Sequence, residues 1–201
     1  MYITATPWEI KNNTEGWTFP DGHTDIYNGY IAVERKEQAK DDHGYYTGSL
    51  ITYVNFVDLD GNLLWDEAPQ KGARMAALTD GYHFSEGLVG YYDSETGLCG
   101  YMDVGGQVVI PARYEMVEAF HEGLAQVRLD GMEYFIDQTG TIVLGPFEGK
   151  LGHFSNGLVN CEVYLDADRQ DYFVGFLDKQ GQPAITIYRG SYGDYSTDEY
   201  L

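Results

Sequence analysis

Phe120-His-Glu-Gly-Leu-Ala125 decides the fold of this chain, because the line recurs as Phe84-Ser-Glu-Gly-Leu-Val89 and as Phe154-Ser-Asn-Gly-Leu-Val159. Each copy closes with a second shared line, which reads Gly100-Tyr-Met-Asp103, Tyr134-Phe-Ile-Asp137 and Gly175-Phe-Leu-Asp178. From Gly87 to Gly123 is 36 residues and from Gly123 to Gly157 is 34, a period typical of repeat architectures. The sequence therefore predicts tandem copies of one structural unit.

The copy that begins at Phe120 predicts an antiparallel meander. Asp130-Gly131 lies between two runs of strand formers, which is the signal for a two-residue hairpin turn. The predicted register pairs Arg128 with Glu133 as an exposed charge pair, Val127 with Tyr134 and Ala125 with Ile136. After Asp137 a turn leads into a third strand at 141–144. The apolar face of one such meander needs a neighbouring unit to bury it.

The whole chain is expected to be all-β, with tandem antiparallel β-meander or hairpin repeats that form a repeat array or a partly closed, propeller-like ring. We expect about four units, at 26–80, 81–116, 117–150 and 151–185, an N-terminal cap at 1–25 and an acidic C-terminal cap or tail at 186–201. The first unit is degenerate, and we expect its last strand at 63–65. The link Pro111-Ala-Arg-Tyr114 is expected to be a turn whose Tyr packs on the next unit.

The spacing between the shared Gly and the closing Asp varies from copy to copy. It is 29 residues from Gly29 to Asp58, 16 from Gly87 to Asp103, 14 from Gly123 to Asp137 and 21 from Gly157 to Asp178. Because the flanking lines stay in phase, the extra residues must lie at hairpin tips, where insertions often form a binding face. The extended tips are predicted at 34–52 and 164–172.

These lines resemble the bacterial WG-repeat family, whose units read as a Phe-x-x-Gly-Leu-Ala line, a Trp-Gly-Tyr-Ile-Asp line, a Gly turn and a Pro-x-x-Tyr connector. The resemblance covers about residues 26–185. The chain departs from it at the namesake Trp, where Val54, Cys99, Glu133 and Val174 stand instead. The resemblance implies a β-repeat scaffold that serves as an interaction module, and it brings no catalytic residues.

Composition limits the class of partner. The chain carries 32 acidic and 12 basic side chains, a formal charge of −20, which repels nucleic acid and anionic membranes and attracts a basic protein. The N-terminal stretch lacks the charge and apolar core of a signal peptide, and Cys99 and Cys161 do not form a repeated framework. We therefore expect a soluble, cytoplasmic protein, unless the chain is a fragment of a longer secreted one.

Several residues invite a chemical interpretation that the repeat itself explains. His83 and His153 each precede the unit's Phe, and His121 follows it, so three imidazoles could converge on a metal only if the units bring them together. Asp58-Leu-Asp60-Gly61-Asn62 lacks the spacing of a calcium loop, and an Asp that caps the following turn is the simpler interpretation. No nucleophile or phosphate motif occurs. The sequence predicts no catalytic residue, no cofactor and no metal site.

Exposed aromatic and acidic side chains at the hairpin tips are the candidate binding residues. They are Tyr45, Tyr46, Tyr91, Tyr92, Tyr164, Asp166, Asp168, Asp171 and Tyr172. An alternative interpretation of the adjacent tyrosines is that they point to opposite faces of a strand. The alternatives for the three aspartates are that they hold a cation or form a solvated loop.

The expected function is a non-catalytic acidic β-repeat scaffold that binds another protein, for example as an inhibitor or immunity-type partner of a basic effector. The alternative is a carbohydrate- or cell-surface-binding module with tyrosine-lined grooves between the hairpins.

Overall fold

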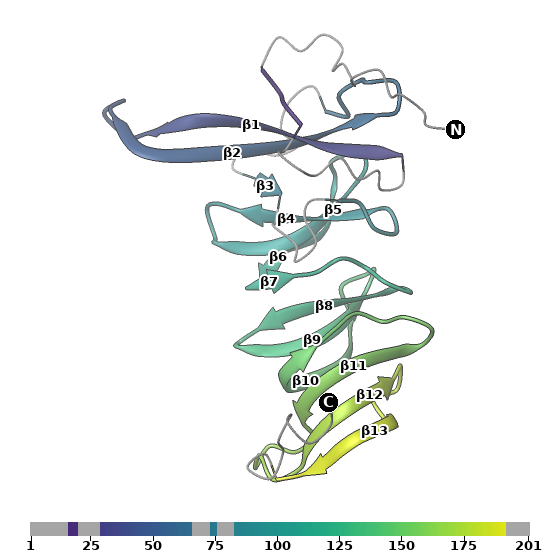
Figure 1. Cartoon of the computed structure of the whole chain (residues 1–201). Helices are drawn as coiled ribbons and strands as arrows, with labels where there is room; N and C mark the ends of the chain where they lie inside the picture. The colour runs from purple at the N-terminus through teal and green to yellow at the C-terminus, as the bar shows by residue number, and fades with distance from the viewer. Residues whose placement is uncertain (1–15, 20–28, 66–72, 76–82, 192–201) are drawn as a thin grey trace.

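The computed structural model of the protein describes residues 16–19, 29–65, 73–75 and 83–191. These residues form thirteen β-strands in three antiparallel sheets, and the sheets follow one another from β1 at one end of the molecule to β13 at the other (Figure 1). The predicted all-β fold of tandem antiparallel repeats is confirmed, and the units form an elongated array. The described part of the chain contains no helix with the length and apolar character that a membrane crossing requires.

The strands follow the chain order within each sheet. The first sheet pairs β1 (Tyr30–Lys40) with β2 (Tyr46–Asp58). The second contains β3 (Ala73–Met75), β4 (Leu88–Asp93), β5 (Leu98–Asp103) and β6 (Val108–Tyr114). The third is a seven-stranded meander of β7 (Met116–Val117), β8 (Leu124–Leu129), β9 (Met132–Asp137), β10 (Ile142–Leu151), β11 (Leu158–Tyr164), β12 (Tyr172–Asp178) and β13 (Pro183–Gly190).

The repeated Gly sits in a tight two-residue turn that opens each unit. In the third unit, His121 and Leu124 exchange two backbone hydrogen bonds around Glu122 and Gly123. Both central residues have positive φ, 54° at Glu122 and 84° at Gly123, as this turn requires. The same turn occurs around Gly87 and Gly157. Gly therefore recurs at this position of the units because the backbone conformation there would strain a residue with a side chain.

A hydrogen-bond ladder links these turns from unit to unit. The backbone N–H of Gly123 donates to the Glu86 carboxylate at 3.0 Å, and that of Gly157 donates to the Glu122 carboxylate at 2.9 Å. Lys179 adds an ion pair to Glu122 at 3.2 Å. The acid beside each Gly thus holds the turn of the next unit in register.

The closing Asp of each unit caps the turn that follows it, as predicted. Asp137 accepts backbone hydrogen bonds from Thr139 at 2.9 Å and Thr141 at 3.0 Å. Asp178 accepts from Gln180 and Gln182, both at 2.9 Å. Asp58 and Asp103 make the same kind of contact. This pattern explains why the calcium-loop interpretation of Asp58 is not needed.

Aromatic pairs connect consecutive units through the core. The ring two places before each closing Asp packs on the Phe that opens the next unit, with centroids 4.6–4.8 Å apart. The pairs are Phe56–Phe84, Tyr101–Phe120 and Phe135–Phe154. All six side chains are at most 2% exposed. Since each of these pairs joins two units, the core continues along the array from one unit to the next.

Two local predictions are wrong. Pro111–Tyr114 is not a turn but the end of β6, whose irregular pairing with β5 accommodates the Pro. Tyr114 does pack on the next unit, as predicted, because it is fully buried among Val117, Phe120 and their neighbours. Residues 63–65 form no strand; Leu63 makes a bridge with Val57, the Leu64 N–H donates to the Phe56 carbonyl, and Trp65 packs into the core.

The third strand of the 117–150 unit is longer than predicted. β10 runs from Ile142 to Leu151, pairs first with β9 and then with β11, and so passes into the next unit. β13 likewise carries the sheet past the boundary expected at residue 185. At the other end, Trp17 is buried against Ile31, Val33 and Val57. Residues 1–15 and 20–25 of the expected N-terminal cap and 192–201 of the expected C-terminal cap lie outside the described residues.

Candidate functional site

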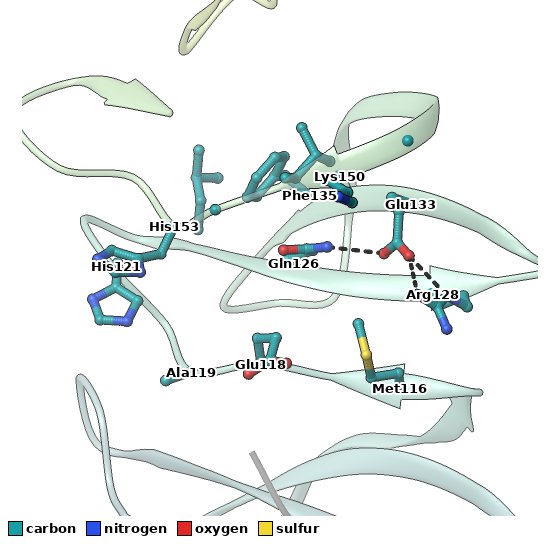
Figure 2. Close-up of a pocket in the computed structure, with 14 residues that line it drawn as sticks. Met116, Glu118, Ala119, His121, Gln126, Arg128, Glu133, Phe135, Lys150 and His153 are labelled. Atoms are coloured by element: carbon teal, nitrogen blue, oxygen red, sulfur yellow. Dashed lines mark hydrogen bonds and ion pairs between the residues drawn. The ribbon is translucent and has the colours of Figure 1, made fainter. Parts of the chain in front are cut away.

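A cavity of roughly 530 Å³ lies between the third and fourth units (Figure 2). Its volume is in the range of small-molecule and side-chain binding pockets. Strands β7, β8 and β9 form one wall, and residues 149–153, at the end of β10 and just beyond it, form the other. The lining residues are Met116, Glu118, Ala119, His121, Leu124, Gln126, Arg128, Glu133, Phe135, Gly149, Lys150, Leu151, Gly152 and His153.

The alternation of side chains along β8 and β9 places both polar and apolar groups on the wall that these strands form. Leu124, Gln126 and Arg128 occupy alternate positions of β8, and Glu133 and Phe135 occupy the paired positions of β9. Leu124 and Phe135 belong to the core formed with Phe154 of the fourth unit. The polar residues lie farther along the same face, so the two units touch at one end of the wall and separate at the other.

Glu133 is the most unusual group in the cavity, because it is a carboxylate that is only 4% exposed. Arg128 reaches one carboxylate oxygen with Nε at 2.7 Å and Nη2 at 2.6 Å, and the Gln126 amide donates to the other at 3.0 Å (Figure 2). The predicted cross-strand partners are therefore confirmed. The expectation of an exposed pair is wrong, since Glu133 is buried while Arg128 stays half-exposed.

The preceding junction provides a direct comparison. In the second unit, Tyr92 and Cys99 are paired in the register that Arg128 and Glu133 have in the third. Tyr92 and Cys99 pack into the core that joins the second and third units. The same two positions are thus aromatic and apolar at a filled junction, but charged at the junction that holds the cavity.

Two imidazoles meet at the end of the cavity opposite Arg128 (Figure 2). His121 and His153 stack with ring centroids 4.3 Å apart and an angle of 27° between their planes. His83 is buried. Within 16–19, 29–65, 73–75 and 83–191, no group of three or more His, Cys, Asp or Glu side chains is placed to hold a metal ion.

The most exposed of the candidate tyrosines lie at the end of the long β1–β2 hairpin. Tyr45 is 72% exposed and Tyr46 is 65% exposed. Asp41 closes this tip by accepting backbone hydrogen bonds from His43 and Tyr45, both at 2.9 Å. The extended tip predicted at 34–52 is confirmed, and most of it is strand, so the hairpin projects beyond the stacked units as an arm (Figure 1).

Tyr91 and Tyr92 do not form an exposed pair. They lie inside β4, where Tyr91 is buried against Phe84 and Met102 on one face and Tyr92 packs on the opposite core. The Tyr91 hydroxyl accepts a hydrogen bond from the backbone of Ala112 at 2.9 Å, and burial raises its pKa. The prediction that Tyr91 is a surface binding residue is wrong, and the alternating arrangement is the correct one.

The tip between Tyr164 and Tyr172 is confirmed as a loop, but two of its three aspartates are engaged by other groups of the protein. Asp166 accepts backbone hydrogen bonds from Gln170 and Asp171, and Asp171 pairs with Arg189 at 2.6 Å. Asp168 is exposed. Tyr172 is buried and packs on Tyr164, with ring centroids 5.1 Å apart. Tyr172 is therefore not a surface residue, contrary to the prediction, and Asp168 keeps the predicted surface position.

Neither cysteine is suited to nucleophilic chemistry. Cys99 and Cys161 are both free and buried. Burial raises the pKa of the Cys99 thiol and raises that of Cys161 to about 12. Both thiols therefore stay protonated near neutral pH, whereas a reactive cysteine needs its thiolate.

Comparison with known proteins identifies the repeat. Residues 100–132 match the family model of the WG containing repeat. The resemblance inferred from the sequence is thus confirmed, on a segment that begins at Gly100 in β5, crosses the connector and ends beyond the Asp130-Gly131 turn. No curated protein and no solved structure matches the chain. The WG-repeat match supports the fold and carries no information on a ligand or partner.

Sequence reasoning missed the cavity, although one signal pointed to it. Glu133 occupies the place of the WG-repeat Trp, and Val54, Cys99 and Val174 stand there in the other units. All three of those side chains are buried. A lone carboxylate at a position that is otherwise apolar in every unit is the pattern that could have identified this junction.

Proposed function

We propose that the protein is a non-catalytic, acidic WG-repeat scaffold that binds another protein through the β1–β2 arm. The observation that carries this proposal is the pair of adjacent tyrosines, Tyr45 and Tyr46, exposed at the tip of the arm. Tyrosine is favoured in protein interfaces because it offers a large apolar area and a polar end with little side-chain entropy to lose.

The construction of the arm supports this role. Along β1, burial ends after Arg35, whose guanidinium lies 5.0 Å from the ring centroids of Trp17 and of Tyr53. From Lys36 to the tip at Tyr46, most side chains are exposed. The arm is thus anchored at its base and capped by Asp41 at its tip, so a partner would meet a surface that is already ordered.

The charge of the chain favours a basic partner. A formal charge of −20 raises the encounter rate with a basic protein and lowers that with nucleic acid or an anionic membrane. An inhibitor or immunity-type role toward a basic effector is the concrete form of the proposal. The arm carries both signs of charge, with Lys36 and Lys40 beside Glu37 and Asp41, so the tyrosines supply contact area and the rest of the surface supplies the attraction.

The proposal is tested by affinity capture from the source cells with the wild type and with Tyr45→Ser/Tyr46→Ser, at low and at high salt. The matched control is Ile185→Ser/Ile187→Ser, which also replaces two exposed, largely apolar side chains with Ser, 49% and 51% exposed, at the opposite end of the array. We expect a basic protein that the wild type and the control retain at low salt and that the tyrosine variant loses. Equal capture by all three proteins would remove the arm from the interface.

A further inference from the structure

We infer that the cavity between the third and fourth units binds an uncharged, planar aromatic group with an N–H or O–H donor, such as an indole or a phenol. This inference is independent of the arm, because the cavity is built by β7 to β10 and not by β1 or β2. Three observations carry it: the shape of the equivalent junction, the polar groups of the cavity wall and the balance of charge around it.

The chain itself shows that such a junction accepts an aromatic ring. At the junction between the second and third units, the side chain of Tyr92 packs against the core that contains Tyr114 and Phe120. In the third unit this position belongs to Arg128, which turns to Glu133 and leaves the equivalent space open. A ring from a ligand would therefore take the place that Tyr92 fills one unit earlier, in contact with Leu124 and Phe135.

The wall of the cavity supplies an acceptor for a donor on that ring. Gln126 uses its amide nitrogen to hold Glu133, so its side-chain oxygen faces away from Glu133 and along the cavity (Figure 2). Among the described residues, no hydrogen bond to that oxygen is made. A buried or half-buried acceptor gains most from a ligand that brings an N–H or O–H group.

The charges around the cavity favour an uncharged ligand. Glu118, Glu133, Arg128 and Lys150 are the acidic and basic residues of the lining, and three of them are already paired, Arg128 with Glu133 and Lys150 with Glu162 at 3.9 Å. A charged ligand would have to displace this pairing or be buried without a counter-charge, which is costly. An anion would in addition be opposed by the overall charge of −20.

Such a ring could belong to a free small molecule or to a Trp or Tyr side chain of a partner protein. Both sources are tested by titrating the ¹⁵N-labelled full chain with indole, with phenol and with N-acetyltryptophanamide, while recording amide chemical shifts. We expect saturable shifts at residues that line the cavity, such as Gln126, Glu133 and Leu151. Binding of indole or phenol alone identifies a free aromatic molecule, and equal or tighter binding of the amide identifies a protein side chain.

Two variants test the cavity itself. Arg128→Tyr/Glu133→Val places at this junction an aromatic and an aliphatic residue, of the kind that fill it elsewhere in the chain, and should abolish the saturable shifts. Gln126→Leu keeps the cavity and removes the acceptor, and should weaken binding about 2–10-fold. Gln182→Leu, the same change at an exposed turn, serves as the control and should bind like the wild type.

Thermal unfolding of each variant shows that the loss of binding does not come from loss of folding. The inference is overturned if none of the three probes produces saturable shifts up to its solubility limit. It is also overturned if the shifts map away from the cavity, or if the folded Arg128→Tyr/Glu133→Val protein binds the probes as well as the wild type does.

Discussion

Two glycines of the repeat are required for different physical reasons, and replacing each with Ala separates them. Gly123 has φ of 84°, and a Cβ built on it meets no atom within 4 Å. Only backbone strain opposes Gly123→Ala, so we expect a loss of about 1–2 kcal/mol in the free energy of unfolding. Gly123→Val should cost about 1–3 kcal/mol for the same reason.

Gly100 has ordinary backbone angles but no room. A Cβ there would lie 2.4 Å from the carbonyl oxygen of Ile110 and 2.8 Å from the backbone nitrogen of Ala112. Because these are backbone atoms of β6, the strand itself would have to move, and we expect Gly100→Ala to cost at least about 3 kcal/mol.

Urea unfolding followed by circular dichroism and tryptophan fluorescence measures both losses by linear extrapolation. We expect the free energy of unfolding to fall from the wild type to Gly123→Ala and further to Gly100→Ala. The slope of this free energy against urea concentration should be similar in all three proteins. A Gly100→Ala protein as stable as Gly123→Ala would refute the close packing of β5 on β6. A Gly123→Ala protein as stable as the wild type would refute the strained turn.

Three further predictions concern charged side chains. A double-mutant cycle on Arg128 and Glu133 should give a coupling of about 1–2 kcal/mol in unfolding free energy, which is more than an exposed pair gives, because Glu133 is buried. A coupling near zero would contradict the ion pair between them. The hydrogen bond from the Gly157 N–H lowers the folded-state pKa of Glu122, so the stabilisation that this carboxylate gives is complete above the unfolded pKa of about 4.3 and is lost as pH falls through the folded pKa. Between neutral pH and pH 3, Glu122→Gln should therefore lose less unfolding free energy than the wild type loses. Equal losses would count against the hydrogen-bond ladder. Asp168→Lys should slow association with a basic partner and leave the unfolding free energy unchanged, since the side chain is exposed; a faster association would contradict the charge argument.

Much of the fold could be predicted from local sequence signals. Asp130-Gly131 and the alternation around it predicted the correct register, with Arg128 opposite Glu133, Val127 opposite Tyr134 and Ala125 opposite Ile136, because two positive φ angles leave only one turn type. The Asp caps could also be predicted, because each Asp contacts backbone groups within five residues of it in the chain.

The errors fall where contacts between units override local signals. Pro111 suggests a turn, yet β6 continues through it because Tyr114 is drawn into the core of the next unit. Tyr91 and Tyr92 suggest a tip, yet both faces of β4 are covered by neighbouring units, a property that one unit's sequence does not show. The cavity at Glu133 depends on the spacing of two units, so the sequence pattern of a single unit could not predict it either.

One measurement tests most directly whether the arm is the binding surface. Isothermal titration calorimetry with the purified captured partner compares the wild type, Tyr45→Ser/Tyr46→Ser and Ile185→Ser/Ile187→Ser, each shown by circular dichroism to be folded. Two interface tyrosines each contribute on the order of 1–2 kcal/mol, so we expect the tyrosine variant to bind at least about 30-fold more weakly while the control keeps the wild-type Kd. A tyrosine variant that binds with the wild-type Kd would contradict the account.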